Sequence, residues 1–234
     1  MGFVEKDIKV CICENCEFRN VIFQFLDDEN VYRLCADKEE RHFKKGEIIN
    51  LEGDRIVDFK YLKKGLVKIY RRSMSGDEQV ITITRPFEFV SNMSIFSEER
   101  YRYSVSALED STVCVVSLDF MKDLFANNGS LALGLLSKVS QVNDKIINQS
   151  LEIRNKNLVG RVAYVLLYFS KEIYSSRVFD LPVSRKEIAD FISMSTANVI
   201  RTLSDFKRDG IITIDGKTID IIDMTKLEMI AKRG

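Results

Sequence analysis

The sequence predicts an α+β protein in three parts: a β-roll over residues 1–117, a long dimerisation helix over residues 118–155, and a winged helix-turn-helix over residues 156–234. Three observations support this division. Short alternating runs fill the first part, a heptad-like apolar seam follows, and two short helical patterns with a hairpin come last.

Composition limits the class of protein. At 234 residues and 45% hydrophobic content, the chain can bury a sizeable core in more than one domain. Its 35 basic and 35 acidic residues leave no net formal charge, so any affinity for nucleic acid has to be local. No apolar run approaches the roughly 18 residues that span a membrane, and the amino terminus carries no secretory signal. We therefore expect a cytoplasmic protein without membrane contact.

Residues 41–117 consist of short strand-like runs separated by turn signals. Lys64-Gly65 and Arg85-Pro86 are two of these signals, and apolar and polar residues alternate over 67–70 and 80–84. Strands at this spacing favour a small barrel or jelly roll.

The pattern then changes from a period of two to a period of about three and a half. One long helix is expected here, with a polar break at Gln149 and an apolar seam made of Leu135, Val139, Val142, Ile146 and Ile153. An apolar seam with charged flanks favours a coiled-coil-like dimer. The alternative is that the seam packs on its own barrel.

Residues 183–210 read as two short helices joined by a tight turn. Ser184 and Glu187 have the spacing of a capping box, and Ser195 can cap a second helix. Val199, Leu203 and Phe206 repeat at helical spacing and must pack against the first helix. Four residues are then left facing outward: Thr196, Ala197, Asn198 and Arg201.

A hairpin follows this helix pair. Gly210 ends the second helix, and strands over 211–214 and 217–222 flank Asp215-Gly216, which suits a type I′ turn. Ser193 stands where helix-turn-helix units often have glycine, at small expected cost. The whole is a winged helix-turn-helix, which enters the DNA major groove. Two amphipathic helices followed by a hairpin also occur in proteins that do not bind nucleic acid. A helix pair without a role in DNA binding is therefore the alternative.

The order of these parts resembles the CRP/FNR family of bacterial transcription regulators over nearly the whole chain. The matching stretches are FKKGEIINLEGD at 43–54, YLKKGLVKIY at 61–70 and DGKTIDI at 215–221. The resemblance implies a cyclic-nucleotide-binding-like β-roll that senses a signal, a symmetric homodimer, and two recognition helices that read a palindromic site in double-stranded DNA. It also implies RNA polymerase as a partner.

The sensing site departs from the cyclic-nucleotide-binding members of that family. These carry a Gly-Glu pair for the ribose and a nearby Arg for the cyclic phosphate, but this chain has Ser91-Asn92 and Tyr101 at those positions, with Arg102 beside them. A buried phosphate without a paired guanidinium is poorly compensated, so we expect no cyclic AMP. The candidate ligand pocket comprises Phe89, Ser91, Asn92, Tyr101 and Arg102.

The cysteines suggest a different signal. Cys11, Cys13, Cys16 and Cys114 supply the four thiolates that an iron–sulfur cluster needs. The oxygen-sensing branch of the resembled family holds a [4Fe–4S] cluster with a cysteine at the strand position of Cys114, although the amino-terminal spacing here is tighter. Another metal such as zinc, or a tail of exposed thiols with a buried Cys114, are the alternatives.

Two further positions are expected to be structural. Cys35 lies among apolar residues of a short helix, and an odd total of five cysteines favours reduced thiols over a disulfide framework. His42 is the only histidine, and a lone strand histidine is not expected to ligate haem.

The resemblance also bears on DNA readout. Family members use a Glu and an Arg four residues apart. Arg201 matches the Arg and suits guanine, whereas Ala197 replaces the Glu. Asn198 suits adenine, and Thr196 and Ala197 suit a thymine methyl, which predicts an A/T-richer half-site. The expected phosphate contacts are Arg185, Lys186, Lys207 and Lys217.

We expect no enzyme, because one histidine excludes most nucleophile–base systems and no Gly-rich phosphate loop or zinc-protease motif appears. The competing class is a ligand-binding regulatory module that docks on another protein instead of on DNA.

Overall fold

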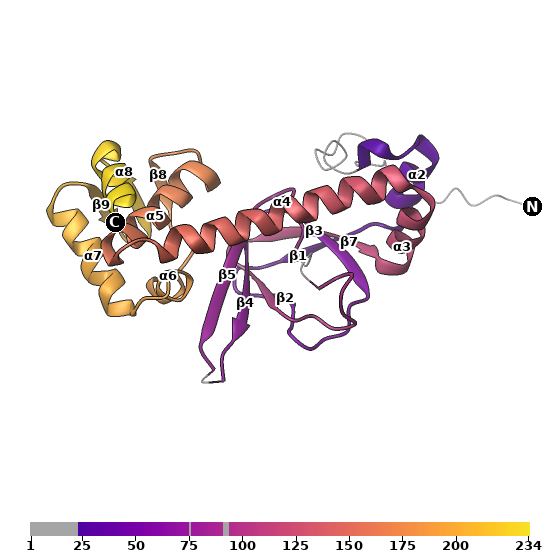
Figure 1. Ribbon diagram of the computed structural model, residues 1–234, viewed down its shortest axis with the longest axis horizontal. Helices are drawn as coiled ribbons and strands as arrows, with labels where there is room; N and C mark the ends of the chain where they lie inside the picture. Colours follow the sequence, from indigo (N-terminus) through magenta and orange to yellow (C-terminus); the bar gives the residue numbers. More distant parts are fainter. Residues whose placement is uncertain (1–22, 75, 91–93) are drawn as a thin grey trace, which may run out of the picture.

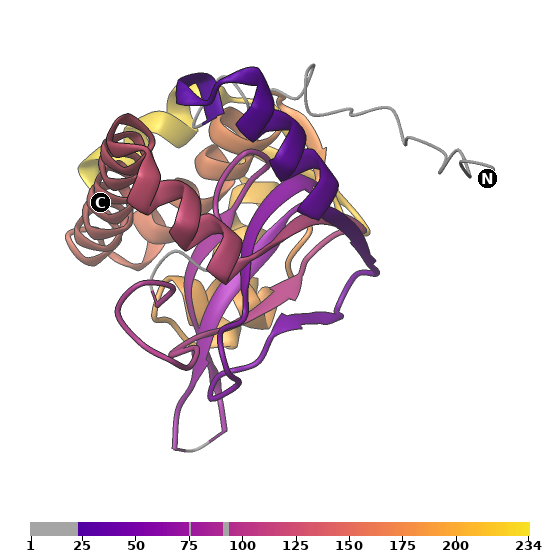
Figure 2. The same cartoon turned by 90° about the vertical axis from the view of Figure 1, so that its right-hand side faces the viewer.

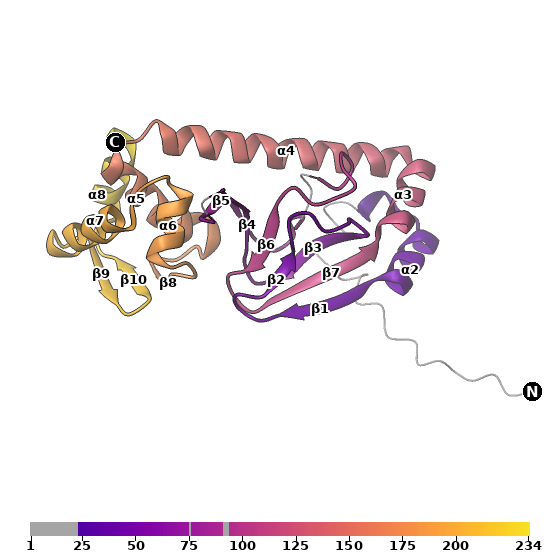
Figure 3. The same cartoon turned by 90° about the horizontal axis from the view of Figure 1, so that it is seen from below.

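The computed structural model describes residues 23–74, 76–90 and 94–234. A β-roll and a carboxyl-terminal domain lie at opposite ends of the long helix α4 (Gly129–Arg154) (Figure 1). Both lie on the same side of this helix (Figure 3). No described helix is long and apolar enough to cross a membrane.

The β-roll consists of two antiparallel sheets. Their strand orders are β1-β7-β3 and β2-β6-β4-β5. The strands are β1 (Glu39–Phe43), β2 (Ile48–Asn50), β3 (Asp58–Lys64), β4 (Val67–Arg72), β5 (Glu78–Thr84), β6 (Ser104–Ala107) and β7 (Ser111–Ser117). Apolar side chains from both sheets fill the interior, as the alternating pattern predicts.

Strand β4 does not alternate as predicted, because Lys68 is buried together with its apolar neighbours. The side that carries Lys68 is covered by the carboxyl-terminal domain, whose Glu187 bonds its ammonium group. Strand periodicity does not report this cover, which comes from a distant part of the chain.

The single helix predicted over 118–155 is two helices, α3 (Leu118–Asn127) and α4. Asn128 breaks them with an extended backbone (φ −136°, ψ 93°), and its side chain accepts a hydrogen bond from Leu131 N at 2.9 Å. This is an N-cap that starts a new helix. Helices α2 (Asp28–Asp37) and α3 lie at the end of the roll seen in Figure 2, after the short 3₁₀ turn η2 (Phe23–Phe25).

Helix α4 packs against its own chain at both ends. Leu135 is buried in the core of the roll, and Ile153 is buried in the core of the carboxyl-terminal domain. These two seam residues thus pack within their own chain, while Val139, Val142 and Ile146 are half-buried. Gln149 is buried too, where Thr82 of β5 donates a hydrogen bond to its Oε1 at 3.4 Å.

The carboxyl-terminal domain contains four α-helices and a three-stranded sheet within the described residues. Its elements are α5 (Leu158–Leu167), the π-helical turn η3 (Tyr168–Ile173), β8 (Val178–Asp180), α6 (Arg185–Phe191), α7 (Thr196–Arg208), β9 (Ile212–Asp215), β10 (Thr218–Ile221) and α8 (Met224–Arg233). Strand β10 lies between β8 and β9. The sequence predicts the hairpin but neither β8 nor the π-helical turn.

Candidate nucleic-acid interface

Helix α6 starts as the sequence predicts. Ser184 accepts a hydrogen bond from Glu187 N at 3.1 Å, and Glu187 accepts one from Ser184 N at 2.8 Å, which completes the capping box. Ile188, Ala189 and Ile192 are buried. These two hydrogen bonds satisfy backbone N–H groups that would otherwise lack a partner, and they therefore determine where α6 begins.

The turn between α6 and α7 bends through a residue in the left-handed region. Ser193 has φ +52°, a conformation that costs an ordinary residue about 1–2 kcal/mol. Serine therefore occupies this turn in a conformation that favours glycine. Ser195 then caps α7 by accepting a hydrogen bond from Asn198 N at 3.3 Å.

Helix α7 buries one face and exposes the other. Val199, Leu203 and Phe206 are buried, as predicted. On the opposite face Ala197 and Arg201 are exposed, and Thr196 and Asn198 are half-exposed. Asp205, one turn further on, pairs with Arg208 at 2.8 Å and not with Arg201.

The structure adds two residues to this outer face. Ile200 is 50% exposed although it is apolar, and Ser204 is exposed one turn later. Both follow Ala197 at the i+3 and i+7 positions, so helical spacing was the signal that could have found them. An exposed isoleucine on this face can contact a thymine methyl.

The wing hairpin differs in its turn from the prediction. Asp215 pairs with Thr218, so Gly216 and Lys217 are the two loop residues. Gly216 has φ +57° and Lys217 does not have a positive φ, as in a type II′ turn, not type I′. The turn leaves Lys217 exposed at the tip of the wing.

The four cations predicted to contact phosphate are not equivalent. Lys207 and Lys217 are exposed, and Lys207 donates to the Ile214 carbonyl at 3.3 Å. Lys186 is held between Asp190 and Asp77, at 3.4 Å from each. Arg185 is half-buried, and burial lowers its pKa.

Lys186 takes part in one of several contacts between the carboxyl-terminal domain and the roll. Lys68 donates to Glu187 at 2.7 Å and to Glu78 at 2.5 Å with its side chain only 9% exposed. Lys45 donates to the Pro182 carbonyl at 2.7 Å. Strands β4 and β5 thus face α6 directly (Figure 1).

In this contact, burial and hydrogen bonding shift the pKa values of Lys68 and Glu187 in opposite directions. Burial alone would lower the pKa of Lys68, but its hydrogen bonds to Glu187 and Glu78 raise it above the ordinary value. Burial alone would raise the pKa of Glu187, but hydrogen bonds from Lys68 and Ser184 lower it. Both groups are therefore charged across the neutral range.

Aromatic residues fill the predicted ligand pocket of the roll. Phe89 is buried with its ring centroid 5.1 Å from that of Phe59, and Tyr101 is buried in the same core. Arg102 is exposed and pairs with Glu98, so it does not join them. Ser91 and Asn92 lie outside the described residues.

The interior of the roll holds a buried cation, Lys60, that the sequence does not predict. Lys60 is buried on β3, where its ammonium donates to Tyr101 Oη at 3.0 Å and lies 3.4 Å from Asp58. Alternation in β3 gives no signal of this, since Lys60 occupies an ordinary strand position.

Two of the five cysteines lie among the described residues, and they differ in bonding. Cys114 is free and 1% exposed on β7, where burial raises the pKa of its thiol. Cys35 is disulfide-bonded, so the expectation of a reduced thiol is wrong there. Cys11, Cys13 and Cys16 lie outside the described residues.

Across residues 23–74, 76–90 and 94–234, no cluster of three or more His, Cys, Asp or Glu side chains could hold a metal ion. His42 is exposed on β1, with Nδ1 3.1 Å from Thr112 Oγ1. A thiol with a raised pKa in an apolar core is not set up as a thiolate ligand.

An apolar groove of about 760 Å³ runs between α4 and the roll. Exposed residues of α4 form its outer wall, with Leu136 61% and Ile147 56% exposed. Phe96 and Tyr103 of the roll and Val139 of α4 line it as well. Three of the predicted seam residues, Leu135, Val139 and Ile146, line this groove, whereas Ile153 does not. This face of α4 is open to another chain.

Two family models match the chain. The model of the cyclic nucleotide-binding domain matches residues 40–128, and the model of the Crp-like helix-turn-helix domain matches residues 160–230. The two segments correspond to the roll and to the domain that contains α6 and α7.

Known proteins of similar sequence and structure agree with these models. The transcriptional activator protein Anr of Pseudomonas aeruginosa is 27% identical over 81% of this chain and 79% of its own length. The anaerobic regulatory protein of Haemophilus influenzae is 24% identical over 92% of this chain and 86% of its own. The structure of FixK2 from Bradyrhizobium japonicum, 21% identical, covers 82% of this chain and 96% of its own with a TM-score of 0.73. The chain belongs to the CRP/FNR family of DNA-binding transcription regulators.

Proposed function

We propose that the protein binds double-stranded DNA as a homodimer and reads a palindromic site with helix α7 of each copy. The observation that carries this proposal is the outer face of α7, where Ala197, Ile200 and Arg201 are exposed beside an intact wing. Two such helices related by a two-fold axis suit half-sites one helical turn apart.

The side chains define the proposed readout. Arg201 donates to a guanine edge, and Asn198 suits adenine. Thr196, Ala197 and Ile200 offer apolar contact to thymine methyls. Lys207 and Lys217 are exposed and can contact phosphate directly. Lys186 can do so only after its ion pair with Asp77 breaks, and Arg185 only if its side chain becomes more exposed.

Arg201→Ala is expected to weaken binding to the preferred palindrome by about 5–150-fold, because a bidentate guanine contact contributes about 1–3 kcal/mol of discrimination. The test is a mobility-shift titration on a duplex selected from a random library. Arg233→Ala, on exposed α8, removes the same charge outside the reading face and serves as control. Equal losses in both variants would reject base readout by Arg201, and no shift with any duplex would favour docking on a protein.

The proposed dimer uses the groove along α4. A second copy of the same helix presents the same exposed Leu136 and Ile147, so the face is self-complementary under two-fold symmetry. We therefore move the dimer seam to Leu136, Val139, Ile146 and Ile147.

Ile147→Asp is expected to convert the dimer to a monomer, because it places a carboxylate in an apolar interface. Sedimentation velocity measures the change. Gln141→Asp adds the same charge to an exposed position of α4 that does not line the groove, and should leave the dimer intact. A dimeric Ile147→Asp protein would place the interface elsewhere.

The signal is proposed to act through the roll. A [4Fe–4S] cluster on Cys11, Cys13, Cys16 and Cys114 is supported by a relative named as an anaerobic regulatory protein. The disulfide of Cys35 uses two of the five cysteines, however, and leaves three thiols, one fewer than such a cluster needs. Cys114 does not fit as the fourth ligand in the described arrangement, because its thiol is buried in the apolar core. Iron and sulfide content after purification without oxygen tests the proposal, and metal-free, colourless protein rejects it.

Transcription regulation also implies contact with RNA polymerase. A relative named as a transcriptional activator supports this part of the proposal. The relatives are named as regulators, in agreement with a role in DNA binding.

A further inference from the structure

Arg161 on α5 connects two places that are far apart in the sequence. Its Nε donates to the Lys156 carbonyl at 2.9 Å, and Nη2 lies 3.4 Å from the Arg154 carbonyl. Its Nη1 donates to the Ile192 carbonyl at 3.2 Å and lies 3.5 Å from that of Ser193. One guanidinium thus contacts the end of α4 and the turn between α6 and α7.

All four acceptors are backbone carbonyls at points where regular structure ends. Arg154 is the last residue of α4, Lys156 lies in the link to α5, and Ile192 is the C-cap of α6. The last carbonyls of a helix have no partner within it, so an external donor satisfies them. Ser193, in the left-handed conformation, turns its carbonyl toward the same donor.

The guanidinium is planar, with its donors in a fixed fork. Acceptors bonded to its different nitrogens are therefore fixed relative to one another. A lysine ammonium has no such fork and cannot hold both sets in one geometry.

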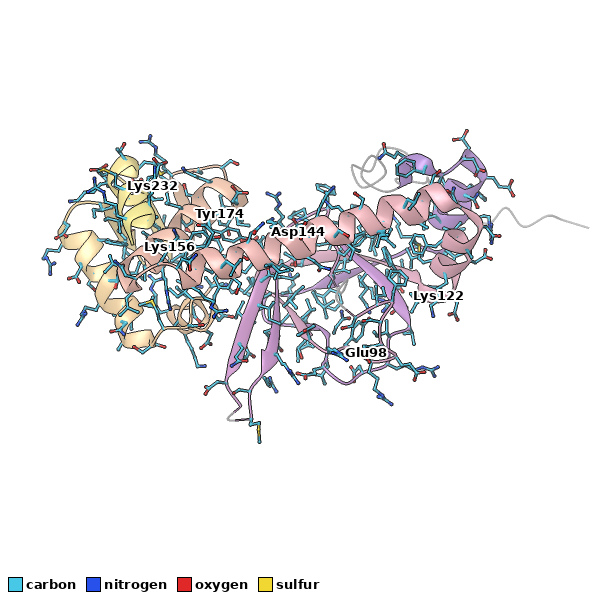
Figure 4. All side chains as sticks on the ribbon, viewed as in Figure 1. Glu98, Lys122, Asp144, Lys156, Tyr174 and Lys232 are labelled. Carbon is cyan, nitrogen blue, oxygen red and sulfur yellow. The ribbon has the colours of Figure 1, made fainter. Side chains whose placement is uncertain are left out.

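Other hydrogen bonds at this junction connect it to the carboxyl-terminal end of the chain. Lys156, at the junction of α4 with the carboxyl-terminal domain in Figure 4, donates to the Ala231 carbonyl of α8 at 2.6 Å. Asn157 caps α5 and donates its N–H to the Gly234 carbonyl. Neither reaches the turn before α7.

We infer that Arg161 is a positioning residue that sets the place of recognition helix α7 relative to dimerisation helix α4. This inference rests on the proposed DNA-binding dimer. Because the two copies of α4 pair about a two-fold axis, a shift of α7 relative to its own α4 occurs in both copies. The separation of the two recognition helices changes accordingly, and this separation sets the half-site spacing.

We expect apolar packing to keep the domain folded without this contact. Val162 of α5 and Val199 of α7 are buried in one core cluster. Arg161→Lys keeps the positive charge and most of the aliphatic stem. It therefore removes the fork and little else.

The experiment measures dissociation constants by fluorescence anisotropy for palindromic duplexes of preferred spacing and for duplexes with one base pair added or removed. Arg161→Lys is expected to weaken binding to the preferred duplex about tenfold, the effect of losing about one charged hydrogen bond. It is also expected to reduce the preference between spacings at least about threefold. Arg154→Gln is the matched control, because its side chain is exposed and only its backbone carbonyl takes part.

The outcomes separate the inference from the proposed function. An unchanged spacing preference in Arg161→Lys, whether or not affinity falls, overturns the positioning role. So does an Arg161→Lys protein that loses its native circular dichroism, since Arg161 would then be needed for folding. If the unaltered protein binds no duplex, the proposed function itself fails.

Discussion

Glu187→Ala is expected to lower the free energy of unfolding by about 2–4 kcal/mol, from the loss of a helix cap and of a charge-assisted hydrogen bond. Glu187 occupies two roles at once, because one carboxylate oxygen accepts from Ser184 N and the other from Lys68 Nζ. Urea unfolding measures the change. Glu228→Ala is the control, since Glu228 forms an exposed pair with Lys171 that contributes about 1 kcal/mol or less.

The pH dependence of this contact follows from the two pKa shifts. The pKa of Glu187 is below its ordinary 4.5, so its stabilisation is present above pH 4.5 and lost as pH falls through the lowered pKa. The pKa of Lys68 is above its ordinary 10.5, so its stabilisation is present below pH 10.5 and lost as pH rises further. The difference between the parent protein and Glu187→Gln should be flat between these limits. A difference that varies across neutral pH would contradict the assignment.

Gly65→Ala is expected to destabilise the roll by about 3 kcal/mol or more, through strain and overlap together. Gly65 joins β3 to β4 with φ +91°, and an added Cβ would lie 2.3 Å from Ser111 Oγ and 2.7 Å from the Asp110 carbonyl. Because a carbonyl of the backbone is involved, a rotamer change cannot relieve the contact.

Gly53→Ala separates the two causes. Gly53 has nearly the same φ, +92°, but a Cβ there would meet no atom within 4 Å. It should cost only the backbone strain, about 1–2 kcal/mol. Thermal and urea unfolding of both variants provide the comparison, and equal losses would show that the overlap near Ser111 is relieved without cost.

The parts of the fold that follow local rules were predictable from the sequence. The capping box at Ser184 and Glu187 and the spacing of Val199, Leu203 and Phe206 each involve residues within one or two helical turns. The structure confirms these features. Asn128 was also a local signal, since asparagine is a favoured N-cap, but helix formers on both sides concealed the break.

The remaining features depend on contacts between distant residues. Lys68 and Glu187 are separated by 119 positions, and nothing in strand periodicity indicates that a lysine of β4 is covered by another domain. The same reason explains why Leu135 and Ile153 were assigned to a partner, because a heptad pattern does not identify which chain covers it. Strand β8 is three residues long and becomes a strand through pairing with β10.

The length of α4, 26 residues, sets the rotation of one domain relative to the other about the helix axis. One residue inserted at its midpoint would turn everything beyond it by about 100° and advance it about 1.5 Å. Lys68 would then face away from Glu187, and the outer surface of α7 would point in a new direction. Seven inserted residues would restore the direction to within about 20°. The number of residues between the two anchored ends of this helix is therefore constrained as strictly as their identity.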